Sequence, residues 1–479
     1  MSDLRAAARI LAFGTAPGVV AEVARDSMRR LTVPELLQLG RAMGDNRQEK
    51  DPELRAVQKA VLDAANEGQA AAALALAAGM AGRNKDGGVA AKLLNESAQS
   101  LYPSMLVAIG TEAVPVVAAA RLDVRRVLMR AALDPARAAG DLARAPLIAH
   151  LLAALAEADG VWAAEQVHSV AEETLVAAEC GVGVRAEWAL VLVHAMTAAL
   201  DFGGSWVAAA DTLAKLHFVL EPLGQPDAVR QLSTRLVHWV SDRPERADAC
   251  VRALFTANPS LQQVNVRGPV ALFTMDILEH LVPYVGRRCT EFVVMPLAAR
   301  YAEQGEAGVG SRLFESAHAL ILTCLERQGP ALADVVPWYT HILLAQYPAA
   351  GISVDLLRIA YAAAVRAADR AVAAESISGL ERRLDEYGPS SVVSNTRRRE
   401  LLCVLVDLLA VAPLSLLPRV MSSVESRALT EPEWATRKLL ADEVQDVVLT
   451  KCDIVRKPAL AQWSWNLRTR LNETIDAKI

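Results

Sequence analysis

The chain has 479 residues, of which 53% are hydrophobic but only 5% aromatic, and its formal net charge is −5. This length suffices for two or three ordinary domains or for one extended, repeat-like body with a large core. The composition excludes a nucleic-acid partner, because such binders carry a basic stripe and none is visible. A core of Ala, Leu and Val favours close-packed helices, since Ala and Leu form helices best and Ala lets helix axes approach.

The sequence of the first 80 residues predicts several Ala-rich helices that are separated by turns containing Gly and Pro. Thr32 and Asp51 each stand just ahead of a proline and can cap the helix that follows. The polar, Gly-ended run Arg83–Gly88 is the clearest early linker. We therefore expect an N-terminal helical region of residues 1–83.

Residues 89–471 predict further helices at intervals of about 20 residues, separated by prolines and glycines. The periodicity inside them is helical, as in Ile148, Leu151, Leu152 and Leu155, which share one helix face. No exact repeat of the tetratricopeptide or ankyrin kind is visible. The predicted fold is all-α, an irregular α-solenoid or stacked helical array of the HEAT or armadillo type.

Six cysteines are scattered along the chain without paired spacing: Cys180, Cys250, Cys289, Cys324, Cys403 and Cys452. We interpret them as small buried hydrophobic residues in a reducing compartment, not as disulfides or a zinc site. No secretory signal is predicted, because Arg9 and Gly14 interrupt the first apolar stretch. The apolar run Trp188–Leu200 is shorter than the roughly 20 residues of a membrane span, so a soluble or peripheral protein is expected.

Motifs of catalysis are absent from the sequence, which lacks a Gly-x-Ser-x-Gly elbow, a phosphate-binding loop and a dinucleotide fingerprint. None of the eight histidines is paired at the i, i+4 spacing of a helical zinc site. His194 and His238 are expected in the core or at an interface, and Glu172–Glu173 on a solvated helix face. The sequence therefore predicts no catalytic residue, no metal and no cofactor.

Two short segments could contact a partner. The basic run of Arg397, Arg398 and Arg399 is typical of an exposed helix start, but it could also hold an acidic partner. Trp463 and Trp465 either pack the last helix or anchor a partner. Both alternatives stay open at this stage.

A helical hairpin is predicted between Ser311 and Ala367. Ser353 is well placed to cap its second helix, with Asp355 in the first turn. Phe314 and His318 of the first helix would pack against that second helix, so we interpret their role as structural.

The chain ends in a polar tail, residues 472–479, that closes with Ala477, Lys478 and Ile479. A small residue, a base and an aliphatic residue with a free carboxylate form the pattern that the receptor for peroxisomal matrix proteins reads. The tail is expected to be exposed and to act as a targeting signal. The alternative is a chance C-terminus.

The central part of the chain, about residues 300–425, resembles the core block of the fungal peroxin-8 family. The resemblance rests on Ser311–His318, Val335–Tyr339, Tyr347–Ser353, Leu356–Tyr361, Arg397–Leu402 and Leu414–Pro418. It implies an all-helical peroxisome biogenesis factor without enzymatic activity, attached peripherally to the matrix side of the peroxisomal membrane.

The resemblance also implies partners. Members of this family are taken to link the receptor-docking and RING ubiquitin-ligase complexes of matrix protein import, and to assist the release of cargo from the import receptor. The tail would then serve as both the import address and a receptor contact. Two other functions remain open, a peroxisomal matrix enzyme on a helical fold and a cytosolic helical scaffold.

Overall fold

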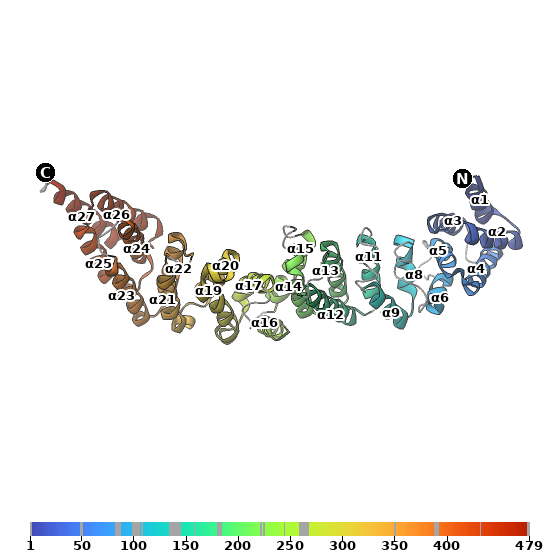
Figure 1. Ribbon diagram of the computed structural model, residues 1–479, viewed down its shortest axis with the longest axis horizontal. Helices are drawn as coiled ribbons and strands as arrows, with labels where there is room; N and C mark the ends of the chain where they lie inside the picture. The colour runs from blue at the N-terminus through green and yellow to red at the C-terminus, as the bar shows by residue number, and fades with distance from the viewer. Residues whose placement is uncertain are drawn as a thin grey trace. The chain divides into compact units, whose positions relative to one another are not determined.

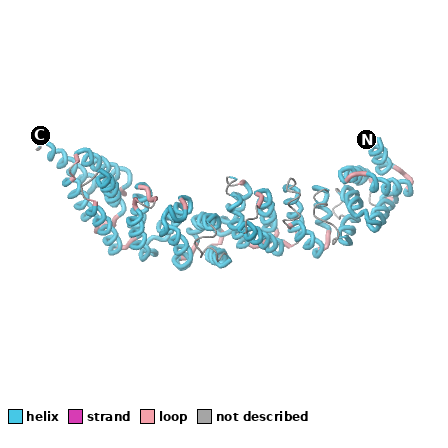
Figure 2. The backbone as a smooth tube through the Cα atoms, in the orientation of Figure 1, coloured by secondary structure: helices cyan, strands magenta, loops and turns pink. Residues whose placement is uncertain are grey.

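The protein is described by a computed structural model in which every regular element is a helix (Figure 2). The described residues are 2–47, 51–81, 88–97, 106, 109–133, 145–157, 159–179, 184–220, 223, 226–243, 245–257, 268–348, 351–387, 392–431 and 433–476. Their contacts divide the chain into two units, Met1–Leu236 and Val237–Ile479. Each unit is described separately below.

The first unit consists of helices that follow one another in chain order (Figure 1). They are α1 (Ser2–Phe13), α2 (Pro17–Arg30), α3 (Val33–Asn46), α4 (Pro52–Ala64), η1 (Ala65–Gln69), α5 (Ala70–Ala81), α6 (Gly88–Ser97), η2 (Gly110–Glu112), α8 (Ala113–Ala119), α9 (Leu122–Ala132), α11 (Ala145–Ala156), α12 (Gly160–Glu179), α13 (Ala186–Asp201), α14 (Trp206–Leu220) and α15 (Asp227–Ser241), within which the division falls.

The second unit has the same organisation (Figure 1). Its helices are α16 (Glu245–Ala257), α17 (Gly268–Leu281), η6 (Val282–Tyr284), α18 (Arg287–Cys289), η7 (Thr290–Val294), α19 (Met295–Val309), α20 (Ser311–Gln328), η8 (Gly329–Val335), α21 (Val336–Gln346), α22 (Val354–Ala367), α23 (Arg370–Glu386), α24 (Val392–Val411), α25 (Leu417–Thr430), α26 (Trp434–Asp446), η9 (Val447–Lys451) and α27 (Lys457–Asp476).

Helices that alternate along the chain pack side by side in both units. In the first unit, α1 packs on α3 and α3 on α5, while α2 packs on α4. In the second unit, row A consists of α17, α20, α22, α24 and α26, and row B of α19, α21 and α23. Pairs adjacent in the chain, such as α21 and α22, join the two rows. Each unit is therefore an irregular α-solenoid, which confirms the predicted fold class.

The helix starts lie where the sequence places them. Thr32 and Asp51 occupy the N-cap positions of α3 and α4, and each precedes a proline in the first turn. The backbone amide and the hydroxyl of Thr32 both donate to the Glu35 carboxylate, at 2.9 and 2.8 Å. In α22 the Ser353 hydroxyl accepts a hydrogen bond of 3.1 Å from the Leu356 amide, as predicted for its cap.

Small residues allow two helices of the first unit to approach closely. Gly40 of α3 faces Gly79 of α5, and a Cβ atom on Gly40 would lie 2.4 Å from the Leu76 carbonyl oxygen and 2.9 Å from the Gly79 Cα. Any side chain at Gly40 would thus force the helices apart. The Ala-rich composition indicates this mode of packing, but it does not indicate which helices meet.

The predicted linker Arg83–Gly88 lies outside the described residues except for Gly88. The helices that flank it, α5 and α6, pack against each other within the first unit. The division seen in the contacts lies after Leu236 instead.

Candidate functional site

The predicted targeting signal at the end of the chain is not tested by the structure. Ala477, Lys478 and Ile479 lie outside the described residues, and α27 ends at Asp476. Their role remains a prediction.

The three arginines predicted as a possible partner site are the sixth to eighth residues of α24, beyond its first turn, and they do not form one patch. Consecutive helical residues point about 100° apart. The Arg398 guanidinium lies 3.3 Å from the Glu431 carboxylate, and these two side chains are only 16% and 6% exposed. Arg397 is half-buried, whereas Arg399 is exposed. Arg398 therefore neutralises a buried carboxylate, and Arg399 is the member of the run that faces solvent.

The predicted hairpin is present, and its polar side chains serve packing. Phe314 and His318 are buried in α20, which packs on α22. His318 Nδ1 lies 2.9 Å from the Tyr339 hydroxyl, and the Phe314 ring meets the imidazole edge-on at a centroid distance of 4.4 Å. Burial lowers the pKa of His318 to about 4, so the imidazole is neutral at physiological pH. This geometry agrees with the structural role predicted for both residues.

A core position is wrong for two other histidines, because His194 and His238 are both exposed, whereas a role at an interface stays a prediction. The apolar run around His194 forms most of α13, but the helix leaves a narrow open stripe at Glu187, His194 and Asp201. These positions are seven residues apart and therefore share one face. Apolar neighbours in sequence did not imply apolar neighbours in space.

The two tryptophans of α27 differ in role. Trp463 is half-buried, and its indole N–H donates to the Glu425 carboxylate at 3.2 Å. Trp465 is 71% exposed. The first therefore packs the last helix, while the second is available for a contact.

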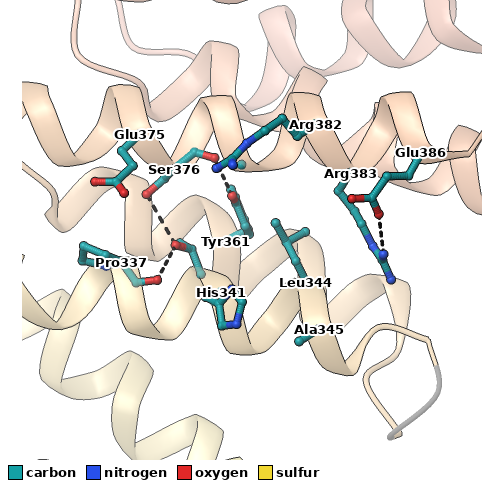
Figure 3. A pocket seen from close by; sticks show the side chains of 12 residues that line it. Pro337, His341, Leu344, Ala345, Tyr361, Glu375, Ser376, Arg382, Arg383 and Glu386 are labelled. Atoms are coloured by element: carbon teal, nitrogen blue, oxygen red, sulfur yellow. Dashed lines mark hydrogen bonds and ion pairs between the residues drawn. The ribbon is translucent and has the colours of Figure 1, made fainter.

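A groove with a volume of about 410 Å³ lies between α21 and α23, with Tyr361 of α22 at its floor (Figure 3). We call it the Tyr361 groove. The Tyr361 hydroxyl donates to the Ser376 carbonyl oxygen at 2.7 Å, and the Thr340 hydroxyl donates to the Val336 carbonyl oxygen at 3.0 Å. The floor is therefore hydrogen-bonded within the protein and does not present a reactive group to a substrate.

The rim of the Tyr361 groove carries mixed charge (Figure 3). Arg383 donates to Glu386 at 2.5 Å within α23, and the exposed side chains of His341, Glu375 and Arg382 complete the rim. Such a surface resembles a contact face more than a catalytic pocket, because its charges do not converge on one point.

The most deeply buried charges of the first unit lie between α12 and α14. Asp211 and Lys215 are each 1% exposed. The Lys215 ammonium lies 2.6 Å from Asp211 Oδ2 and 3.2 Å from His168 Nε2, and it also contacts the Glu172 carboxylate. His168 Nε2 forms a hydrogen bond with Asp211. We call these four residues the Lys215 cluster.

The charges of the Lys215 cluster compensate one another. Burial would raise the pKa of Asp211, but the His168 hydrogen bond and the Lys215 charge outweigh burial and hold the pKa below its ordinary value. Glu172 is therefore not simply a solvated residue, as the sequence suggested. The signal that could have revealed the cluster is Asp211 with Lys215, an i, i+4 pair inside an otherwise apolar helix.

Metal and membrane features can be assessed for the described residues only. Within them no group of three or more His, Cys, Asp or Glu side chains could hold a metal ion. Five cysteines in this part of the chain are buried free thiols, and Cys180 lies outside it. Burial raises the pKa of Cys250 to about 11. No helix among these residues has both the length and the apolar character required to cross a bilayer.

Comparison with known proteins gives one family match. The sequence model of the PEX8 central TPR-like domain matches residues 247–326, which extend from α16 into α20. No curated protein matches the chain. The matched segment overlaps the block that carries the sequence resemblance, about residues 300–425, only at about residues 300–326.

Solved structures show only a general likeness in helical architecture. The crystal structure of Kap121p aligns with 98% of this chain and 54% of its own length, at 11% identity and a TM-score of 0.40. An engineered protein aligns with 94% of this chain and 100% of its own, at 12% identity and a TM-score of 0.30. The Kap95:Nup1 complex aligns with 94% of this chain and 63% of its own length, at 13% identity and a TM-score of 0.29. The chain thus spans about half of Kap121p, and scores this low carry no functional conclusion.

Proposed function

With the PEX8 central TPR-like domain at residues 247–326, the chain belongs to the PEX8 family of peroxisome biogenesis proteins, and we propose that it acts as a non-enzymatic helical scaffold in matrix protein import. The family match is the observation that carries this proposal. The stacked helices of the two units support it, because such arrays present extended faces for binding other proteins.

The chemistry of the described residues also supports a role in binding. The floor of the Tyr361 groove is hydrogen-bonded internally, and the Lys215 cluster is a set of mutually compensated charges. An enzyme requires a pocket in which unengaged polar groups converge on a substrate. Neither place offers that arrangement.

The proposed partners are the import receptor and the docking and RING complexes. The chain would bind the two complexes at the same time, assist cargo release from the receptor, and associate peripherally with the matrix side of the peroxisomal membrane. These roles are those that the family resemblance implies.

A bridging experiment tests the scaffold role. A docking-complex subunit would be immunoprecipitated from cells with and without the chain, and the RING-complex subunits that accompany it would be quantified. A scaffold should raise the amount of RING subunits recovered severalfold. Equal recovery from both cell lines would refute the linking role.

The structure shows which arginine of α24 to mutate in a test for an acidic partner. Arg399→Glu changes an exposed side chain, whereas a change at Arg398 would also strand the buried Glu431 carboxylate. Arg370→Glu is the control, because Arg370 is also an exposed helical arginine, at the start of α23, and the variant makes the same change in net charge. If Arg399 contacts an acidic partner, only the first variant should weaken recovery. Equal effects would exclude that contact.

The proposal includes a targeting role for Ala477, Lys478 and Ile479. Deletion of Ile479 removes the apolar side chain and shifts the carboxylate, so it should abolish binding to the purified import receptor and peroxisomal localisation. Replacement of Ile479 by Leu is the matched control and should retain both. If the deletion leaves binding and localisation unchanged, these residues are not the address.

A further inference from the structure

A second groove, with a volume of about 680 Å³, lies across row A of the second unit, at α20, α22, α24 and α26. We call it the Ile359 groove. Its apolar lining consists of Ile359, Ala362, Ala363, Ala410 and Val411. Ile359 is 62% exposed. An exposed aliphatic side chain above a floor of small residues is suited to receive an apolar side chain of a partner.

The basic groups inside the groove are already neutralised. Arg358 donates from Nε to Asp407 at 2.6 Å and from Nη2 at 3.2 Å, and it also contacts Glu443. The Lys451 ammonium lies 2.7 Å from Asp407 Oδ1, the oxygen that also accepts the bond from Arg358 Nη2. The hydrogen bonds that Arg358 donates to Asp407 in particular hold the pKa of Arg358 above its ordinary value. These two cations therefore contribute little positive potential to a ligand.

The rim is acidic. Glu326, Asp355 and Asp446 line the groove and are exposed, and none forms an ion pair or a side-chain hydrogen bond within the described part of the chain. Arg366 is the basic residue at the rim that also forms no ion pair or side-chain hydrogen bond within the described residues.

From these observations we propose that the Ile359 groove binds a basic, amphipathic segment of a partner protein. An apolar side chain of that segment rests on Ile359 and the alanines, and its Lys or Arg side chains lie near Glu326, Asp355 and Asp446. Charge complementarity selects this occupant, because the same rim repels the phosphates of a membrane or a nucleic acid. The inference rests on the proposed scaffold function and names the chemistry of one of its partners.

Binding of synthetic peptides to the purified full chain tests the proposal. The probe is a fluorescein-labelled helical peptide of leucine, alanine and lysine, and its counterpart carries glutamate in place of lysine. Fluorescence anisotropy should show binding of the lysine peptide, which weakens as salt is raised. Stronger binding of the glutamate peptide, or of vesicles rich in anionic lipid, would overturn the proposal.

Charge variants locate the site. Asp355→Lys combined with Asp446→Lys should weaken binding of the lysine peptide about tenfold at low salt, because two favourable charge contacts become repulsive. Asp242→Lys combined with Glu375→Lys is the matched control, since it makes the same change in net charge at exposed carboxylates outside the groove. Equal weakening by both pairs would mean attraction to the net charge alone and would refute the site.

An apolar variant tests the floor. Ile359→Ser should weaken binding about fivefold, through the loss of one buried aliphatic contact. Leu414→Ser removes a comparable aliphatic residue, 54% exposed and outside the groove, and should have no effect. Because both side chains are exposed, the variants should unfold at the same urea concentration as the parent chain. The peptide assay measures binding alone, so its failure is distinct from a failure of the bridging experiment.

Discussion

Replacing Lys215 by Met tests how the first unit tolerates buried charge. The Lys215 ammonium contacts Asp211, Glu172 and His168, and the variant would leave the Asp211 carboxylate, 1% exposed, with its cationic partner removed. Glu172 is 43% exposed at its side chain and can regain water at little cost. Breaking one partner of a buried pair costs about 3–5 kcal/mol, so Lys215→Met should destabilise the unit by about 4 kcal/mol.

Amide hydrogen exchange in α12 and α14 is the appropriate assay, because unfolding of a chain with two units is not a two-state process. Arg30→Met is the control, since its ion pair with Asp26 spans 2.9 Å on the exposed face of α2 and should contribute less than about 0.5 kcal/mol. Asp211→Asn combined with Lys215→Met should recover much of the loss, because the buried negative charge that Lys215 compensates is then removed as well. Equal protection in Lys215→Met and Arg30→Met, or a double variant less stable than the single one, would refute the reasoning.

Three further changes have defined outcomes. Gly40→Ala should destabilise the packing of α3 on α5 by about 1–3 kcal/mol, because its Cβ atom would meet the α5 backbone. Gly18→Ala, with no atom within 4 Å of the added Cβ, should stabilise α2 by about 0.5–1 kcal/mol. Amide exchange should show lower protection in the first variant and higher protection in the second, and equal changes in both would contradict this. Ser353→Ala removes the cap of α22 and should cost about 1 kcal/mol, visible as faster exchange of the Leu356 amide, and unchanged exchange would count against it. The pKa of His318 is about 4 in the folded protein and about 6.5 in an unfolded chain. The unfolded state therefore binds the proton first, and stability should fall by up to about 3 kcal/mol as the pH drops from about 6.5 to 4. His318→Gln should remove this slope, and a persistent slope would exclude His318 as its source.

Local signals in the sequence predicted the helices well. A cap and a proline act on the turn that contains them, so Thr32, Asp51 and Ser353 could be assigned without knowledge of the fold. The helical spacing of Phe314 and His318 likewise indicated a buried face, and both residues are buried.

Signals that depend on tertiary contacts were missed. Lys215 and His168 lie 47 residues apart, and only the packing of α12 on α14 brings them together. Which face of a helix is buried also depends on its neighbours in space. The apolar residues on either side of His194 in the sequence therefore did not place this histidine in the core. The Ile359 groove was also missed, because its rim combines residues from α20, α22 and α26.

The family was recognised from the sequence, but the matched domain lies mainly upstream of the block that suggested it. The domain model covers residues 247–326, whereas the resemblance was placed at about 300–425. Helical patterns of Leu and Ala recur along the whole chain, so they locate a family block less sharply than a catalytic motif would.

Import of matrix proteins in cells that lack the chain is the most direct test of the scaffold function. Several unrelated matrix enzymes would be followed by fluorescence microscopy, before and after the intact chain is restored. A scaffold of the import machinery predicts that all of them remain in the cytosol and that the chain returns them to peroxisomes. Normal import of every matrix enzyme in its absence would contradict the account.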